Sequence, residues 1–265
     1  MTALPTKRDE AWRYSDLDAL GRVWPVPVPD KIIVAAGESR RVNLVQDAAA
    51  DQVAVRDFTI EVGVGASFAM QLVNSGGKLG RVALDVTLYE GAAFDLDAAL
   101  IGGEGQTIEL VTTVRHFEAN AISRQTVRGI AGAKSTLSYL GKVAVSRGAQ
   151  KTDAVQSVKS MLLDRSATVN AKPELEIFAD DVKCAHGATV GELDTQALFY
   201  LASRGLPPAE AKSLLLHAFV SGLFDGSEDE AKFIAAIDAA LERVVIPLPL
   251  AGGVGGGLDR RGRCS

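Results

Sequence analysis

The chain has 265 residues, of which 47% are hydrophobic and 23% are charged, and its formal net charge is −5. This balance is ordinary for a soluble globular protein, and the negative charge disfavours a nucleic-acid-binding surface. No apolar run of about 18 residues is present to span a membrane, and the first ten residues lack the apolar stretch of a secretion signal. The two cysteines, Cys184 and Cys264, are too far apart to suggest a disulfide framework. We therefore expect a cytoplasmic protein without membrane or nucleic-acid partners.

The N-terminal segment is expected to form a short helical arm followed by a stiff linker. Thr6 opens a Ser/Thr-x-x-acid pattern typical of a helix start, and Trp12, Leu17 and Leu20 could line one side of the arm. Three prolines within residues 23–29 then exclude further helix, because each fixes φ and lacks a backbone donor.

The next part of the chain repeats a period of two. Ile108, Leu110, Thr112 and Val114 form one of several alternating segments, and such segments separated by glycine-containing turns predict an all-β core. A Gly-Ala pair follows several of these segments and suggests a recurrent corner between stacked coils. Because the corners are unevenly spaced, the pattern alone leaves a β-helix, a sandwich and a barrel open. The expected corners are at Gly65, Gly91, Gly132, Gly148 and Gly187.

After Gly191 the apolar residues recur at helical spacing. The first helix is expected to end at Arg204-Gly205, a cation followed by a glycine cap, and the second to begin at Pro207-Pro208. The stripe expected to pack inward on this second helix consists of Ala211, Leu214, Leu215, Ala218 and Phe219. The predicted division of the chain is an N-terminal arm and linker, a β core, a helical subdomain and a glycine-rich, disordered tail, at residues 1–30, 31–190, 191–246 and 247–265.

Cys184 and His186 are the candidate site residues. Two positions apart in an extended strand, they would leave the same face, and a thiolate with an imidazole suits zinc, ferrous iron or an iron–sulfur cluster. They supply only half of a coordination shell, and no Cys-x-x-Cys motif or second Cys/His pair completes it. The remaining ligands would come from elsewhere, most simply from a partner subunit. The alternative is a small buried thiol beside a histidine that caps a backbone carbonyl.

Other polar motifs favour structural interpretations. Asp180 and Asp181 are adjacent and would point to opposite faces of a strand, so we expect solvated turn charges rather than a catalytic acid pair. His116 is expected to be a satisfied, inward histidine at a strand end, and His217 to lie at the surface of a helix. The segment that begins at Gly132 lacks the Gly-Lys pair and the following helix of a phosphate loop, so no ATP site is expected on this chain.

Several segments carry more specific motifs, namely residues 9–17, 148–154, 172–177, 178–191 and 191–206. Together they resemble the SufB/SufD family of iron–sulfur cluster assembly proteins, and within it the SufD subunit. The resemblance implies a right-handed parallel β-helix, that is, a flattened solenoid. The chain departs from the family in the polar residues that precede Leu162-Leu163, and its short β core implies fewer coils.

The resemblance also implies a function. The chain would be a non-catalytic scaffold that pairs with a SufB-type subunit, or with itself in isolation, and a transient iron–sulfur cluster would form at the shared interface with help from Cys184 and His186. Its C-terminal helices would hold a SufC-type ABC ATPase, which would hydrolyse the ATP. The expected docking residues are Leu198, Phe199, Leu201, Arg204, Gly205, Leu206, Leu214, Leu215 and Phe219.

Two other interpretations stay open from the residues alone. A β-helix enzyme that acts on carbohydrate would use Asp180, Lys183 and His186, although an aromatic content of 6% is low for a sugar-binding groove. A purely structural solenoid would need neither Cys184 nor His186.

Overall fold

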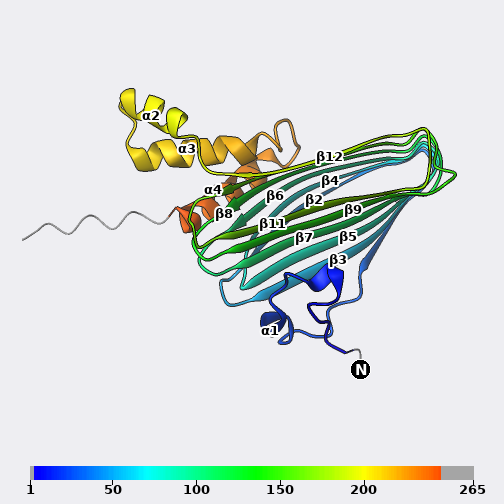
Figure 1. The fold of residues 1–265 in the computed structure, drawn as a ribbon, viewed down its shortest axis with the longest axis horizontal. Helices are drawn as coiled ribbons and strands as arrows, with labels where there is room; N and C mark the ends of the chain where they lie inside the picture. Colours follow the sequence, from blue (N-terminus) through cyan, green and yellow to red (C-terminus); the bar gives the residue numbers. More distant parts are fainter. Residues whose placement is uncertain (1–2, 246–265) are drawn as a thin grey trace, which may run out of the picture.

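The computed structural model describes residues 3–245, and in this part the chain forms a parallel β-solenoid of about six turns with helices before and after it (Figure 1). Within these residues the strands make two six-stranded parallel sheets, ordered β1-β3-β5-β7-β9-β11 and β12-β10-β8-β6-β4-β2. The chain therefore changes sheet after every strand, and two strands make one coil. The expected solenoid class with a C-terminal helical region is confirmed.

The strands of the solenoid are nearly uniform in length. The first sheet contains β1 (Asp30–Val34), β3 (Val53–Val62), β5 (Leu79–Leu88), β7 (Thr107–His116), β9 (Thr136–Val145) and β11 (Thr168–Ile177). The second sheet contains β2 (Ser39–Ala48), β4 (Ser67–Gly76), β6 (Ala93–Gly102), β8 (Ile122–Ala131), β10 (Asp153–Leu162) and β12 (Lys183–Gly191). The variation in corner spacing along the sequence therefore arises in the turns, whereas the strands keep their length.

Pairing in register aligns equivalent residues of successive coils into columns. Val62, Leu88, His116, Val145 and Ile177 form one such column in the first sheet. Inward and outward residues alternate along each strand, as the period of two predicts, and the inward residues merge into one continuous apolar core between the sheets. Burial of this apolar surface is the main source of stability for the solenoid.

The expected corners are confirmed at Gly65 and Gly91, which lie in turns with φ of 61° and 65°. The corner predicted at Gly187 is wrong, because this residue lies inside β12 and pairs with Ser157 of β10. The residues on both sides of Gly187 also pair with β10, so the strand is continuous at this position. A Gly-Ala pair is also compatible with an extended strand, so the dipeptide alone does not specify a turn.

The N-terminal arm lies against the outer face of the first sheet (Figure 1). It contains a 3-10 turn, η1 (Glu10–Trp12), and a short helix, α1 (Leu17–Leu20). Trp12, Leu17 and Leu20 pack together over Leu79, so the predicted apolar side of the arm is confirmed.

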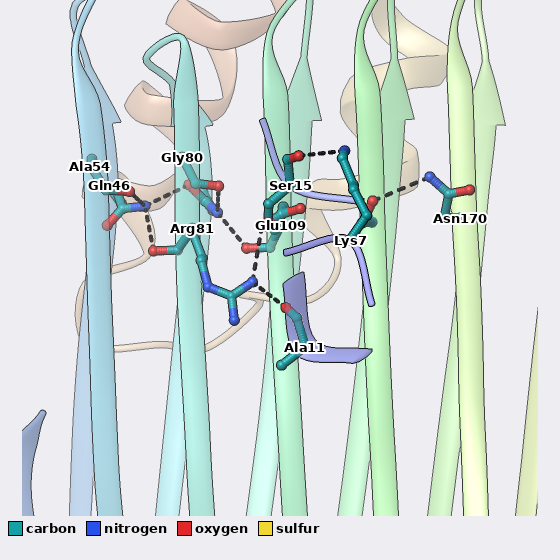
Figure 2. Close-up of polar contacts among 11 residues, drawn as sticks. Lys7, Ala11, Ser15, Gln46, Ala54, Gly80, Arg81, Glu109 and Asn170 are labelled. Carbon is teal, nitrogen blue, oxygen red and sulfur yellow. Dashed lines mark hydrogen bonds and ion pairs between the residues drawn. The ribbon is translucent and has the colours of Figure 1, made fainter. Parts of the chain in front are cut away.

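A buried ion pair anchors this arm. Arg81 and Glu109 are only 2% and 1% exposed, and Arg81 Nη1 lies 3.0 Å from Glu109 Oε2. The arm completes the site: Arg81 Nη1 donates to the Ala11 carbonyl at 2.9 Å, and Ser15 Oγ donates to Glu109 Oε2 at 2.6 Å (Figure 2). The Trp12 ring covers the guanidinium group, 3.8 Å from its central carbon. The arm thus removes both charges from water and supplies hydrogen bonds that offset part of the cost of their burial, while Arg81 Nε has no partner among the described residues.

The C-terminal helices are α2 (Thr195–Ser203), α3 (Pro208–Ser221) and α4 (Glu230–Val244). Helices α3 and α4 pack on the outer face of the second sheet through an apolar cluster that includes Ile101, Ile130 and the stacked rings of Phe224 and Phe233. The expected end of α2 at Arg204-Gly205 is confirmed, since Arg204 is the C-cap and Gly205 has a φ of 92°. No helix in the described part of the chain is long and apolar enough to cross a membrane.

The stripe predicted on α3 is correct for Ala211 and Phe219 but wrong for Leu214. The buried residues are Ala211, Leu216 and Val220, whereas Leu214 is 49% exposed. The sequence offers three consecutive leucines at 214–216, and only packing against the sheet and α4 decides which of them faces inward.

Two glycines allow the C-terminal end of α4 to pack closely on the solenoid. A Cβ atom on Gly132 would lie 2.7 Å from Val244 Cγ1, and one on Gly103 would lie 3.1 Å from Val244 Cγ2. Gly132 therefore serves close packing in the segment that resembles a phosphate loop, and a strand, β9, follows it instead of a helix. The predicted tail, residues 247–265, lies outside the described residues.

We predict that Glu109→Ala destabilises the protein by about 3–5 kcal/mol, because it leaves the Arg81 charge buried without its partner and removes the acceptor for Ser15. The matched control is Asp85→Ala, which breaks a half-exposed pair with Arg115 and should cost at most about 1 kcal/mol. Urea unfolding followed by circular dichroism measures both. Equal losses in the two variants would contradict the anchoring role.

Candidate functional site

Cys184 and His186 lie on β12, which pairs with β10 alone. Their register partners on β10 are Ala154 and Gln156, both buried in the interior of the solenoid. Cys184 and His186 therefore face the interior side of the last coil, on the strand that runs along the upper edge of the second sheet in Figure 1. Among the described residues no further coil covers them. The end of the solenoid is open at this point.

The two side chains have different surroundings. Cys184 is partly buried and packs against the core, whereas His186 is exposed. Burial raises the pKa of the Cys184 thiol, with the backbone of Ala154 acting in the opposite direction. The thiol is therefore held in its protonated form until a metal or a cationic group favours the thiolate.

The pair does not make a complete metal site with other described residues. Within residues 3–245 no group of three or more His, Cys, Asp or Glu side chains is placed to hold a metal ion. One sulfur and one imidazole nitrogen remain available at the open end, a donor set compatible with iron, zinc or a cluster.

The strand that carries the pair has an unprotected edge. From Cys184 to Gly191 it contains no charged residue, and its backbone groups on the side away from β10 have no strand to pair with in the described structure. At the opposite end of the solenoid, β2 carries Arg40 and Arg41, and charges of this kind block edge-to-edge pairing. From Cys184 onward the edge of β12 thus lacks the charges that β2 carries, whereas β11, the other edge strand at the same end, contains Lys172, Pro173, Glu174 and Glu176.

The interior beneath the pair is polar, which the sequence did not indicate. Gln156 and Tyr139 are both buried, and Gln156 Nε2 donates to the Tyr139 hydroxyl at 3.1 Å. Burial raises the pKa of Tyr139 to about 12, so its hydroxyl stays protonated. The fold reveals a sequence signal, because the inward position of Gln156 is apolar in the first three coils, and that of Tyr139 is Val82 and Leu110 in the two coils before it.

The residues expected to dock a partner lie in three consecutive segments. Leu198, Phe199 and Leu201 are on α2, Arg204, Gly205 and Leu206 form the turn after it, and Leu214, Leu215 and Phe219 are on α3. Helix α2 buries none of its residues, and Phe199 and Tyr200 are 76% and 56% exposed. Phe219, in contrast, packs inward beneath α3, with its ring centre 5.9 Å from the Arg128 guanidinium carbon.

The remaining polar candidates have structural surroundings. His116 is fully buried, and its Nε2 lies 2.9 Å from Ser123 Oγ, so the expected inward histidine is confirmed. His217 is half-buried, with Nε2 3.4 Å from Asp238 Oδ1. Asp180 is exposed, and Asp181 forms an exposed ion pair with Lys151, in keeping with solvated turn charges.

The model of a known family, described as "SUF system FeS cluster assembly, SufBD core domain", matches residues 31–219. The chain belongs to the SufBD family. Among curated proteins, the SufBD chain is 33% identical over 141 residues to the iron–sulfur cluster assembly protein SufD of Escherichia coli K12, and 30% identical over 155 residues to SufD of Bacillus subtilis 168. A SufBD family protein of Synechocystis is 36% identical over 155 residues.

These matches cover 53%, 58% and 58% of the SufBD chain but only 33%, 35% and 34% of the relatives. The chain thus spans about a third of the length of the curated relatives that it matches. The match places it in an iron–sulfur cluster assembly system, as its motifs suggested.

We predict that His116 makes the stability of the protein depend on pH. Burial lowers its pKa from 6.5 to about 4, so the folded state disfavours the proton that the unfolded chain binds. The stability is fully present above pH 6.5 and falls as the pH drops toward 4, by about 3 kcal/mol. His116→Gln should lack this part of the decrease, whereas the control His217→Gln should retain it. Unfolding curves of the three proteins between pH 4 and 7 measure the difference, and parallel decreases in all three would contradict the prediction.

Proposed function

We propose that the chain is a SufD-type, non-catalytic scaffold subunit of an iron–sulfur cluster assembly complex. The observation that carries this proposal is the open edge of β12, which is uncharged from Cys184 to Gly191 and bears Cys184 and His186. A homologous SufB-type subunit has the same kind of solenoid and would pair with this edge by strand addition. The pairing would extend both sheets and cover the inward face of the last coil.

The cluster would be the cargo of the shared interface. Cys184 and His186 would supply a thiolate and an imidazole from this chain, and the partner would supply the remaining ligands. Cys184 is partly exposed and His186 is exposed, so both are within reach of the second subunit. The raised pKa of Cys184 suits a site that takes up metal only when the interface is formed, because the thiol must lose its proton to bind.

The C-terminal helices would dock a SufC-type ABC ATPase. Helix α2 follows β12 after a link of three residues, 192–194, and exposes Phe199 and Tyr200 on a helix that buries none of its own side chains. Exposed aromatic residues are typical anchors of an interface. Closure of two ATPase subunits on ATP would pull on α2 and thereby on the strand that carries Cys184 and His186. ATP hydrolysis is expected in the partner.

We predict that His186→Ala removes most of the iron from the complex co-expressed with SufB-type and SufC-type partners. Anaerobic reconstitution, visible absorption and iron content measure the effect, and His217→Ala is the matched control, since His217 lies on α3 and contacts Asp238 of α4. If the complex with His186→Ala is intact and its iron content is unchanged, the chain has only a mechanical role.

We also predict that Phe199→Asp lowers the affinity for a SufC-type protein by about ten-fold or more, because it places a charge in the apolar docking face. Phe199 is 76% exposed, so its replacement should leave the fold intact. Val28→Asp is the matched control, since Val28 is 88% exposed on the N-terminal linker. Pull-down titration measures both variants. Undiminished capture by Phe199→Asp would exclude α2 from the docking face.

A further inference from the structure

One interior column of the second sheet changes from apolar to polar as it approaches the open end. Strand register aligns Val42, Met70 and Leu96 in the first three coils and Gln125, Gln156 and His186 in the last three. Burying amides where apolar side chains fit equally well lowers stability unless the amides are hydrogen-bonded. The glutamines in the second half of the column therefore need hydrogen-bond partners that offset this cost.

A tyrosine hydroxyl organises the two glutamines. Tyr139 reaches across from β9, and its hydroxyl lies 3.2 Å from Gln125 Oε1 and 3.1 Å from Gln156 Nε2. Thr112 Oγ1 donates to Gln125 Oε1 at 2.7 Å. Gly141 leaves room for the ring, because a Cβ atom there would lie 2.1 Å from the Tyr139 hydroxyl oxygen. The backbone of β9 is thus shaped to hold this hydroxyl in the core.

These bonds fix which end of the Gln156 amide is free. Thr112 Oγ1, which lies 3.3 Å from the Tyr139 hydroxyl, donates to Gln125 Oε1, and the Tyr139 hydroxyl gives its single proton to the same oxygen, so Gln156 presents its nitrogen to Tyr139. Gln156 is 1% exposed, and its Oε1 has no hydrogen-bond partner among the described residues. A buried acceptor left in this state is costly.

His186 is the donor best placed to satisfy it. The adjacent amide nitrogen in the column, Gln125 Nε2, is likewise without a partner in the described structure, so it does not fill this role. His186 is the neighbour of Gln156 on the other side, on the same inward face, and paired parallel strands lie about 4.8 Å apart. Exposed side chains change rotamer within nanoseconds, so the ring can turn toward the free oxygen.

We propose that Gln156 is a positioning residue for His186. Its Oε1 accepts a hydrogen bond from one ring nitrogen, and this bond leaves the other nitrogen unprotonated and directed to the open end. A histidine that binds metal needs this arrangement, since the ligating nitrogen must carry no proton and the second nitrogen is held by an acceptor. The metal-binding consequence rests on the proposed function, whereas the hydrogen bond itself is independent of it.

The test is the tautomer of His186 in the full chain without metal. The protein has three histidines, so ring nitrogen-15 spectra of histidine-labelled protein are simple, and His186→Gln assigns the signal. At a pH where the ring is neutral, Gln156→Leu should change the ratio of the two His186 tautomers by about five-fold, which corresponds to about 1 kcal/mol. The control is Gln125→Leu, which perturbs the same tyrosine one coil farther from His186 and should leave the ratio unchanged.

An unchanged ratio in Gln156→Leu, or an equal change in both variants, would overturn the proposal. If Gln156→Leu does not fold, a measurement on the wild-type protein tests the proposal instead. A nuclear Overhauser contact between the His186 ring and the Gln156 side-chain amide is expected, and its absence would overturn the proposal. A confirmed tautomer shift together with unchanged iron in the His186→Ala complex would reject the metal-binding role alone.

Discussion

Stacking of one coil on the next is the constraint on which this structure depends. A single coil cannot bury its inward side chains, so each strand needs a parallel neighbour on both edges. Interior coils have both neighbours, but the first and last coils have one each. The first coil places Arg40 and Arg41 at its edge, whereas β12 has only uncharged residues from Cys184 onward. The incomplete stacking of the last coil therefore coincides with the candidate donors, and the same surface would serve assembly and chemistry.

Buried polar groups elsewhere in the structure also depend on the elements that cover them. The pair of Arg81 and Glu109 is buried only because the arm covers it, so a segment without a core of its own is fixed to the solenoid by charge and by Trp12. Inside the last three coils, Tyr139 and Gln156 replace apolar packing with hydrogen bonds. Both features replace some apolar packing with hydrogen-bonded groups whose direction is defined, although Arg81 Nε and Gln156 Oε1 have no partner among the described residues.

Periodicity in the sequence was enough to predict the strands, the helical region after Gly191 and the end of α2 at Gly205. It could not separate a solenoid from a sandwich, because that choice depends on which strands pair, and the family resemblance was needed. It misplaced Gly187 in a corner and the inward face of α3, since tertiary neighbours choose among Leu214, Leu215 and Leu216. Cys184 and His186 could be selected by residue type and spacing. Gln156 could not, because its role depends on a register across three coils that only the fold defines.

The central claim is that the open end formed by β11 and β12 is the face that pairs with a homologous subunit. Hydrogen exchange followed by mass spectrometry, on the chain alone and in complex with a SufB-type partner, tests it most directly. The account predicts rapid exchange in residues 183–191 of the isolated chain, because β12 has one free edge, and strong protection of the same residues in the complex. Protection at residues 30–48, with β12 unchanged, would contradict it and would place the partner at the first coil.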